Sequence, residues 1–309
     1  MNILVTGGCG NIGVHVVKVL AEKGHFVRVV DKDAEGLKNL AAPQVETLPG
    51  DFSDKDFISA AVKGMDVILH LAWSFSQDPV ELFETDVKGY AHLLNAAVEH
   101  GIQQVINTST AVAYGKPLYN PVDEDHPRLV EQARKPMYAL AKLATEKLGL
   151  IYSQEHGLPV NTIVIWWAYG DEIGGKHVRS MVKDVIQKGE LLVPKDCGGS
   201  FLQLDDFVAG LEAMFERKPS GQTYNFDTVY LTWEELAQII ASRANPDAKI
   251  IPVSKEEWTG STFLTEDWNF STEKAAKELG YKSQFTKEEA VDHLGRALGA
   301  CIAEVRSNL

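Results

Sequence analysis

The chain has 309 residues, a length that predicts one large domain or two coupled domains. Hydrophobic residues make up 45% and charged residues 24%, which is typical of a globular protein rather than a fibrous or membrane-spanning one. The formal net charge is −13, so neither nucleic acid nor a membrane surface is an expected partner. The three distant cysteines and nine dispersed histidines exclude a disulfide framework and a metal site, and the absence of a leader pattern indicates a cytoplasmic protein.

Short apolar runs alternate with longer amphipathic segments in the first half of the chain. Strands are expected, in chain order, at Asn2–Thr6, His25–Val30, Val45–Leu48, Val67–His70, Gln104–Thr108 and Val160–Trp166. Helices are expected between them at Asn11–Lys23, Asp54–Lys63, Pro79–His100 and Pro136–His156. This alternation predicts an α/β fold, a Rossmann-type doubly wound parallel sheet with helices on both faces.

The alternation weakens after about residue 167, where glycine pairs, tryptophans and short helices (Thr232–Ala244, Thr272–Leu279) follow. These features indicate a smaller C-terminal α/β lobe that completes a substrate cleft. We therefore expect a Rossmann domain at residues 1–166, to which residues 200–230 return. Residues 167–199 and 231–309 form the expected substrate-binding lobe.

A glycine-rich turn, TGGCGNIG at residues 6–13, follows the first strand and opens the first helix. Gly7 and Gly10 allow a tight turn beside a pyrophosphate, and Gly13 lets the helix lie close to the sheet. Asn11 and Ile12 begin that helix, whose N-terminus offers N–H donors to the same group. The context predicts a dinucleotide site.

Acidic and apolar residues at the following strand ends extend this site. Asp31 ends the second strand, where a carboxylate accepts hydrogen bonds from ribose hydroxyls and repels a 2′-phosphate, so NAD is favoured over NADP. Lys32 beside it leaves NADP open. Further cofactor contacts are expected from the ends of the third and fourth strands, at Asp51, Phe52, Leu71, Ala72 and Trp73.

Tyr138 and Lys142 lie four residues apart on one expected helix, so their side chains share a face. A tyrosine hydroxyl is a weak acid with a pKa near about 10, and a neighbouring ammonium favours the phenolate. The spacing therefore indicates a proton-transfer pair.

These motifs come in the order of a known family, together with HLA at 70–72, TSTAVAYG at 108–115, FLQLDD at 201–206 and TYNF at 223–226. The chain resembles the extended short-chain dehydrogenase/reductases, and more narrowly the NAD-dependent epimerase/dehydratase family. The resemblance implies that Thr110, Tyr138 and Lys142 are catalytic, with Ser109 as an alternative hydroxyl. It also implies that Thr108, Tyr138 and Lys142 contact the cofactor.

Departures from the family pattern bear on the substrate. Ser109-Thr110-Ala111 offers no acid for dehydration, and Gly198-Gly199-Ser200 replaces an Arg that usually binds a diphosphate, so a substrate other than a nucleotide sugar is favoured. Lys176 and His177 suit a carboxylate or phosphate, but a solvated helix face explains them equally well. The expected substrate residues are Ser74, Ser109, Thr110, Tyr114, Trp166, Trp167, Arg179 and Gln203.

We predict an NAD-dependent dehydrogenase acting on a secondary alcohol or ketone of a sugar, sugar acid or similar small polyol. An NAD-retaining sugar or nucleotide-sugar epimerase is the alternative, and a non-catalytic NAD-binding regulatory protein is a remote one. The partner is a small molecule, and a homodimer through residues 79–100 and 136–156 is expected. The apolar residues of the first of these helices also suit a monomer's core: Leu82, Phe83, Tyr90, Leu93 and Leu94.

Overall fold

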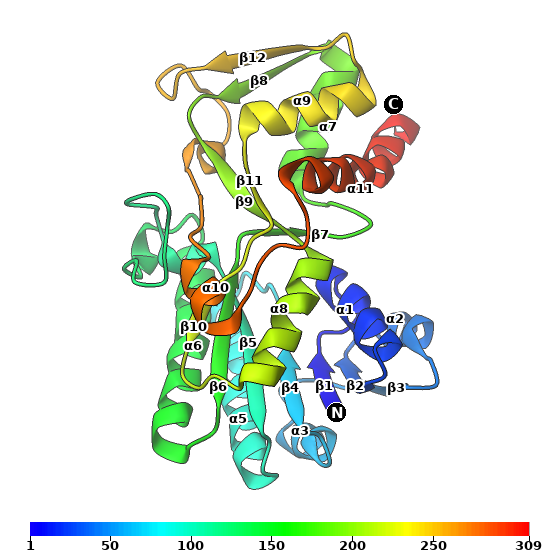
Figure 1. Ribbon diagram of the computed structural model, residues 1–309, viewed down its shortest axis with the longest axis vertical. Helices are drawn as coiled ribbons and strands as arrows, with labels where there is room; N and C mark the ends of the chain where they lie inside the picture. The colour runs from blue at the N-terminus through cyan, green and yellow to red at the C-terminus, as the bar shows by residue number, and fades with distance from the viewer. Residues whose placement is uncertain (309) are drawn as a thin grey trace.

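The apolar runs form one parallel sheet in the computed structural model, which describes residues 1–308. Its order is β10-β6-β5-β4-β1-β2-β3 (Figure 1). The strands are β1 (Asn2–Thr6), β2 (Phe26–Asp31), β3 (Val45–Pro49), β4 (Val67–His70), β5 (Gln104–Thr110), β6 (Val160–Ile165) and β10 (Thr223–Asn225). Sequence order reverses at β1, where Thr6 pairs with Val30 of β2 on one side and with His70 of β4 on the other. The carboxyl ends of β1 and β4 therefore border the crevice in which such folds bind ligands.

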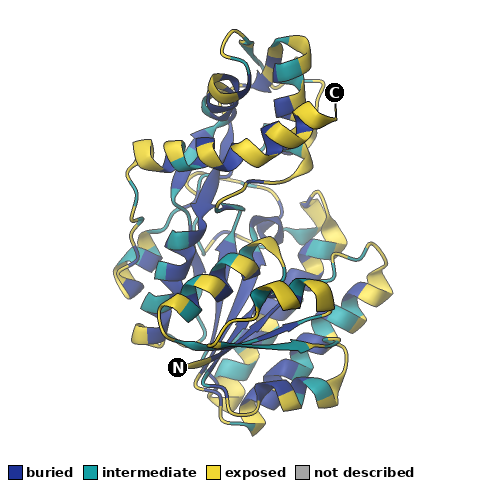
Figure 2. Cartoon of the chain, turned by 90° about the vertical axis from the view of Figure 1, so that its right-hand side faces the viewer, coloured by how far each residue is buried: buried dark blue, intermediate teal, exposed yellow. Residues whose placement is uncertain are grey.

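Helices cover both faces of the sheet because each buries one apolar stripe against it. One face carries α1 (Asn11–Glu22), α2 (Ala34–Leu40), α8 (Leu204–Arg217) and α10 (Glu273–Leu279). The other carries α3 (Lys55–Val62), α5 (Gly89–Glu99) and α6 (Pro136–His156). Figure 2 shows the strands as a buried layer with exposed helix surfaces outside it. The predicted doubly wound Rossmann-type fold is confirmed.

The segment expected as one helix over residues 79–100 is interrupted, which corrects that expectation. It consists of α4 (Pro79–Leu82), a π-helical turn (Phe83–Lys88) and α5. A π-turn inserts one extra residue into the helix and so rotates a side chain relative to its neighbours. Here Asp86 is buried at 4% exposure and faces the sheet's carboxyl edge.

The apolar residues first considered for a dimer interface mostly belong to the monomer. Leu82, Tyr90, Leu93 and Leu94 are at most 2% exposed, and the last three pack with α3, β4 and β5 in one core. Only Phe83 of that group is partly exposed. These residues therefore give no support to a dimer.

The smaller lobe stands above the carboxyl edge of the large sheet (Figure 1). It contains a sheet of β7 (Trp167–Tyr169), β9 (Gly198–Gln203) and β11 (Val229–Thr232), and a parallel pair of β8 (Glu190–Pro194) and β12 (Lys249–Val253). Helices α7 (Lys176–Lys188), α9 (Trp233–Ala244) and α11 (Lys287–Ser307) share its core. Within residues 200–230, α8 and β10 lie on the large sheet, whereas β9 and β11 belong to the small one.

Three 3-10 turns complete the elements, at Ala111–Tyr114, Val130–Gln132 and Thr262–Thr265. The first turn follows β5 directly. The third turn belongs to the small lobe and lines the same cavity as Thr110 at the end of β5. None of the helices within residues 1–308 combines the length and apolar character that crossing a bilayer requires.

Candidate active site

The glycine turn between β1 and α1 is shaped by close backbone approach. Gly7 has a φ of 72°, and a Cβ there would lie 2.7 Å from the backbone of Ala72. A Cβ on Gly13 would lie 2.4 Å from the carbonyl oxygen of Gly7. Gly10 precedes α1 without a side-chain cap, so the first N–H groups of the helix remain free for an anion. The turn fits the pyrophosphate of a dinucleotide.

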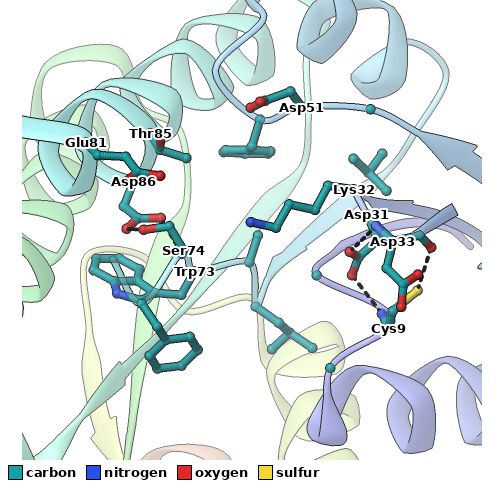
Figure 3. Close-up of a pocket in the computed structure, with 18 residues that line it drawn as sticks. Cys9, Asp31, Lys32, Asp33, Asp51, Trp73, Ser74, Glu81, Thr85 and Asp86 are labelled. Atoms are coloured by element: carbon teal, nitrogen blue, oxygen red, sulfur yellow. Dashed lines mark hydrogen bonds between the residues drawn. The ribbon is translucent and has the colours of Figure 1, made fainter. Parts of the chain in front are cut away.

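A cavity of about 350 Å³ opens beside this turn, at the carboxyl ends of β1, β2 and β4 (Figure 3). Of the expected cofactor residues, it is lined by Gly7, Gly10, Asp31, Asp51, Phe52, Leu71, Ala72 and Trp73. Asn11, Ile12 and Gly13 lie in the helix behind the turn and do not line it. Lys32, noted in the sequence for its charge beside Asp31, lines it as well. So do Cys9, Asp33, Phe75, Glu81 and Thr85, for which residue type alone gave no signal.

Asp31 lies at the end of this cavity that is next to the glycine turn and β2. One carboxylate oxygen accepts the Cys9 N–H at 2.9 Å and the other accepts the Asp33 N–H at 3.0 Å, as the dashed lines in Figure 3 mark. Lys32 extends its ammonium into the cavity from the same strand end (Figure 3). Two bonds from Ser53, through its N–H and its hydroxyl, lower the pKa of Asp51. The lowered pKa keeps Asp51 in its ionised form, which only accepts hydrogen bonds.

Ser74 and Asp86 form the opposite wall. The Asp86 carboxylate accepts the Ser74 N–H at 2.8 Å and the Ser74 hydroxyl at 2.6 Å, which fixes the loop after β4. Burial raises the pKa of Asp86, and the Ser74 bonds and the charge of Lys142 oppose this rise. Ser74 therefore lines the cofactor cavity, rather than the substrate side on which it was expected.

Lys142 is covered by Trp73. Its Nζ donates to the Thr108 carbonyl at 2.9 Å and lies 3.7 Å from the centre of the Trp73 ring. Burial lowers the pKa of Lys142 to about 7, although Asp86 and Glu146 act against this. Thr108 reaches the site through that carbonyl, since its hydroxyl is bonded to His70. Lys142 is not among the groups that act on the pKa of Tyr138 in this structure, so the expectation that it acidifies Tyr138 stays a prediction.

Tyr138 lies between aromatic rings. Trp73 meets it edge-on at 5.6 Å and Phe75, which has a left-handed φ of 54°, stacks on it at 6.0 Å. Burial raises the pKa of Tyr138 to about 12, while contact with the Thr110 hydroxyl and the charge of Arg134 lower it. Arg134, which the sequence did not single out, is therefore the cation that acts on the phenol.

Ser109 and Tyr114 do not reach the cleft, so we withdraw both as substrate residues. Ser109 is 3% exposed and donates to Glu146, which Arg128 holds from the other side at 3.2 Å. Tyr114 is fully buried, donates to Asn225 at 2.6 Å and carries the Arg128 guanidinium over its ring. Successive side chains of a strand point to opposite faces of the sheet. Ser109 therefore points away from the cleft, towards Glu146, and Thr110 is the hydroxyl that lines the cleft.

Arg179 and Gln203 also lie away from the cleft. Arg179 pairs with Glu304 on α11 at 3.1 Å, on the outer surface of the small lobe. Gln203 is 5% exposed, caps α8 through the Asp205 N–H and bonds the Asp205 carboxylate. Arg179 and Gln203 both belong to elements that border the cleft. However, the Arg179 side chain lies on the outward face of α7 and the Gln203 side chain is turned towards the start of α8, so neither reaches the cleft.

A second cavity, of about 520 Å³, lies between the lobes next to Thr110. Trp166 and Trp167 line it, as expected, with Phe263 packed between them and the opposite wall. Arg134 lines it too, with its guanidinium 4.1 Å from the centre of the Phe263 ring. Arg134 also lines a third cavity of about 260 Å³, together with Phe75 and Tyr138. Arg134 therefore lines both the cavity that contains Tyr138 and the 520 Å³ cavity between the lobes.

Comparison with known proteins finds one family model and several relatives that match most of the chain. The model of the NAD dependent epimerase/dehydratase family matches residues 3–226. The UDP-N-acetyl-alpha-D-glucosaminuronate decarboxylase of Bacillus cytotoxicus is 30% identical over 271 residues, which cover 82% of this chain and 84% of that enzyme.

Two solved structures share the fold. The UDP-glucose 4-epimerase of Thermotoga maritima has a TM-score of 0.80 at 22% identity, over 96% of this chain and 98% of that one. The dTDP-glucose 4,6-dehydratase of Streptomyces venezuelae, solved with NAD bound, has a TM-score of 0.76 at 24% identity, over 100% and 98%.

Proposed function

This chain belongs to the NAD-dependent epimerase/dehydratase family, and we propose that it oxidises a secondary alcohol of a sugar and returns the hydride within one catalytic cycle, as an epimerase does. The relatives support this reading better than the net dehydrogenase favoured by the sequence, because they are named as a decarboxylase, an epimerase and a dehydratase. The observation that carries the proposal is the position of Tyr138. Its ring contacts Trp73 of the cofactor cavity, and the same residue lines the adjoining space towards the small lobe.

Bound NAD supplies the hydride acceptor and donor. Tyr138 takes the proton from the substrate hydroxyl and gives it back, and Thr110 holds the reacting oxygen in line. Arg134 favours the phenolate of Tyr138 through its charge, against the effect of burial on the pKa. Lys142, which donates to the Thr108 carbonyl, would hold the cofactor ribose, and the Trp73 ring that covers its amine would have to move aside for that contact.

Dehydration has less support from the residues present. The cavity next to Thr110 has no carboxylate in its lining that could protonate a leaving hydroxyl. The buried Glu146 is engaged by Ser109 and Arg128 instead. A sugar hydroxyl that is oxidised and then reduced again requires no such acid.

The test is a hydride-tracing assay on the purified protein. We expect NAD to remain with the protein through gel filtration and to be released by denaturation. A panel of free and nucleotide-linked sugars, deuterated at each candidate carbon, should give an epimer that retains deuterium without stoichiometric NADH in solution. Accumulation of free NADH would instead support the dehydrogenase, and absence of any affinity for NAD would refute both.

Tyr138→Phe provides the matched variant, since it removes only the hydroxyl. We expect NAD retention to persist and turnover to fall by about 10²–10⁴-fold, the usual contribution of a positioned acid–base group. Unchanged turnover would show that another group transfers the proton.

Assembly and location remain predictions. We propose a homodimer through α4, α5 and α6, because Val80, Val98, Met137, Leu140 and Ile151 expose apolar side chains there. Sedimentation showing only monomer at micromolar concentration would contradict it. The cytoplasmic location expected from the sequence likewise stays a prediction.

A further inference from the structure

The cavity between the lobes has an unusual charge for this protein. The chain as a whole carries a net charge of −13. The 350 Å³ cavity beside the glycine turn, where the cofactor is expected, is likewise mainly acidic, with Asp31, Asp33, Asp51, Glu81 and Asp86 in its wall. The 520 Å³ cavity next to Thr110 is the opposite: Arg134, Lys135, Lys176 and His177 line it, and none of its lining residues is acidic.

Within the part of the chain that the structure describes, the cations of this cavity form no ion pair, although Glu266 acts on one of them: burial lowers the pKa of Arg134, and the charge of Glu266 opposes this. Within residues 1–308, the side chains of Arg134, Lys135 and Lys176 form no ion pair and no hydrogen bond. Glu266 lies beside Arg134 in a small neighbouring cavity, where its carboxylate accepts the Trp268 indole N–H at 2.8 Å. The positive charges therefore face the open space of the cavity.

Arg134 and His177 both contact the ring of Phe263. The Arg134 guanidinium is 4.1 Å, and the His177 ring 4.8 Å, from the centre of the same Phe263 ring. Burial lowers the pKa of His177, and the charges of Lys176 and Arg134 lower it further. Arg134 and Lys176 are the charged groups here and would stabilise an anion beside them, whereas the lowered pKa of His177 favours its neutral ring, which adds an N–H donor but no charge. The N-terminus of α7, at Lys176, adds partial positive charge on the same side.

We propose that this cavity is a subsite for an anionic oxygen group of the substrate, so that the enzyme acts on an acidic sugar, a sugar acid or a sugar phosphate. This inference rests on the proposed function, because Thr110 of the same cavity must reach the reacting oxygen. Arg134 sits close enough to Tyr138 for its charge to act on the phenol, which puts the anionic group near the reacting carbon. Trp166 and Trp167 give the sugar ring flat faces to lie against.

The test measures binding without turnover. Protein saturated with NADH cannot oxidise a sugar, so calorimetric titration with D-glucuronate, D-glucose 6-phosphate and D-glucose compares a carboxylate, a phosphate and a neutral ring on equal terms. We expect one of the acids to bind at least about 10-fold more tightly than glucose, because charge-assisted hydrogen bonds are the strong ones. Preference for glucuronate identifies a carboxylate subsite, and preference for glucose 6-phosphate a phosphate subsite.

Two variants locate the subsite. Arg134→Met keeps an unbranched apolar side chain but removes the guanidinium and its charge, and should weaken binding of the preferred acid by about 10- to 100-fold while leaving glucose binding unchanged. Lys176→Met should give a smaller loss in the same direction. Arg217→Met is the matched control, an exposed arginine at the end of α8 that lines neither cavity.

The proposal is overturned if both acids bind no more tightly than glucose, if neither acid binds saturably, or if both cavity variants leave acid binding unchanged. A protein that takes up no NADH would refute the proposed function instead. In that case the same titrations on the protein alone still decide whether the anion subsite exists.

Discussion

Lys142→Met tests the account of the site through stability rather than catalysis. The amine is 4% exposed, and its pKa falls from the usual 10.5 to about 7 in the folded chain. Between these two values the unfolded chain binds more protons than the folded one, so raising the pH through this window stabilises the wild-type protein. Below about pH 7 both states hold the proton, and the full cost of burying the charge is present.

The magnitude follows from the size of that window. Each pKa unit corresponds to about 1.4 kcal/mol, and at pH 7 the folded amine is about half protonated, so the wild-type free energy of unfolding should rise by about 2 kcal/mol from pH 7 to pH 9 relative to the variant. Loss of the bond to the Thr108 carbonyl costs a further amount of about 1–3 kcal/mol, but this cost does not depend on pH. The pH dependence therefore isolates the buried charge.

The assay is urea unfolding of cofactor-free wild type and Lys142→Met at pH 6, 7, 8 and 9. Lys147→Met, an exposed lysine on the same helix, is the control and should follow the wild-type profile. A wild-type minus Lys142→Met difference that stays constant between pH 7 and pH 9 would refute the burial of the amine beneath Trp73.

Two further predictions concern the cofactor site. Gly13→Ala should destabilise the fold by about 1–3 kcal/mol and weaken NAD binding, because its Cβ would meet the Gly7 carbonyl at 2.4 Å. Urea unfolding measures this, with Gly299→Ala as the control on open helix surface, which should stabilise the fold by about 0.5–1 kcal/mol. Asp31→Ser should lower NADH affinity by about 10-fold and narrow the preference over NADPH, because the ribose acceptor and its repulsion of a 2′-phosphate are both lost. Fluorescence titration with both nucleotides checks this, and an unchanged ratio of affinities would contradict the role of Asp31.

The local sequence determined the strands, the helices and the glycine turn that carry the site. Period-two and period-3.6 patterns fixed the strand and helix order, and the glycine spacing at 7, 10 and 13 fixed the turn, because both are short-range properties of the backbone. Asp31 at the end of β2 followed from the same reasoning, and so did the choice of NAD.

The tertiary structure decided which side chains face the cleft. Ser109 and Gln203 turn inward, and Arg179 turns out to Glu304, because strand and helix phase is set by packing against elements distant in sequence. Arg134 joins the site only because Phe263, far along the chain, supplies the surface on which its guanidinium lies. The pKa shifts of Lys142 and Tyr138 could not be predicted from the sequence either. Whether Lys142 acidifies Tyr138 or rests under Trp73 depends on burial, and burial is a property of the folded chain alone.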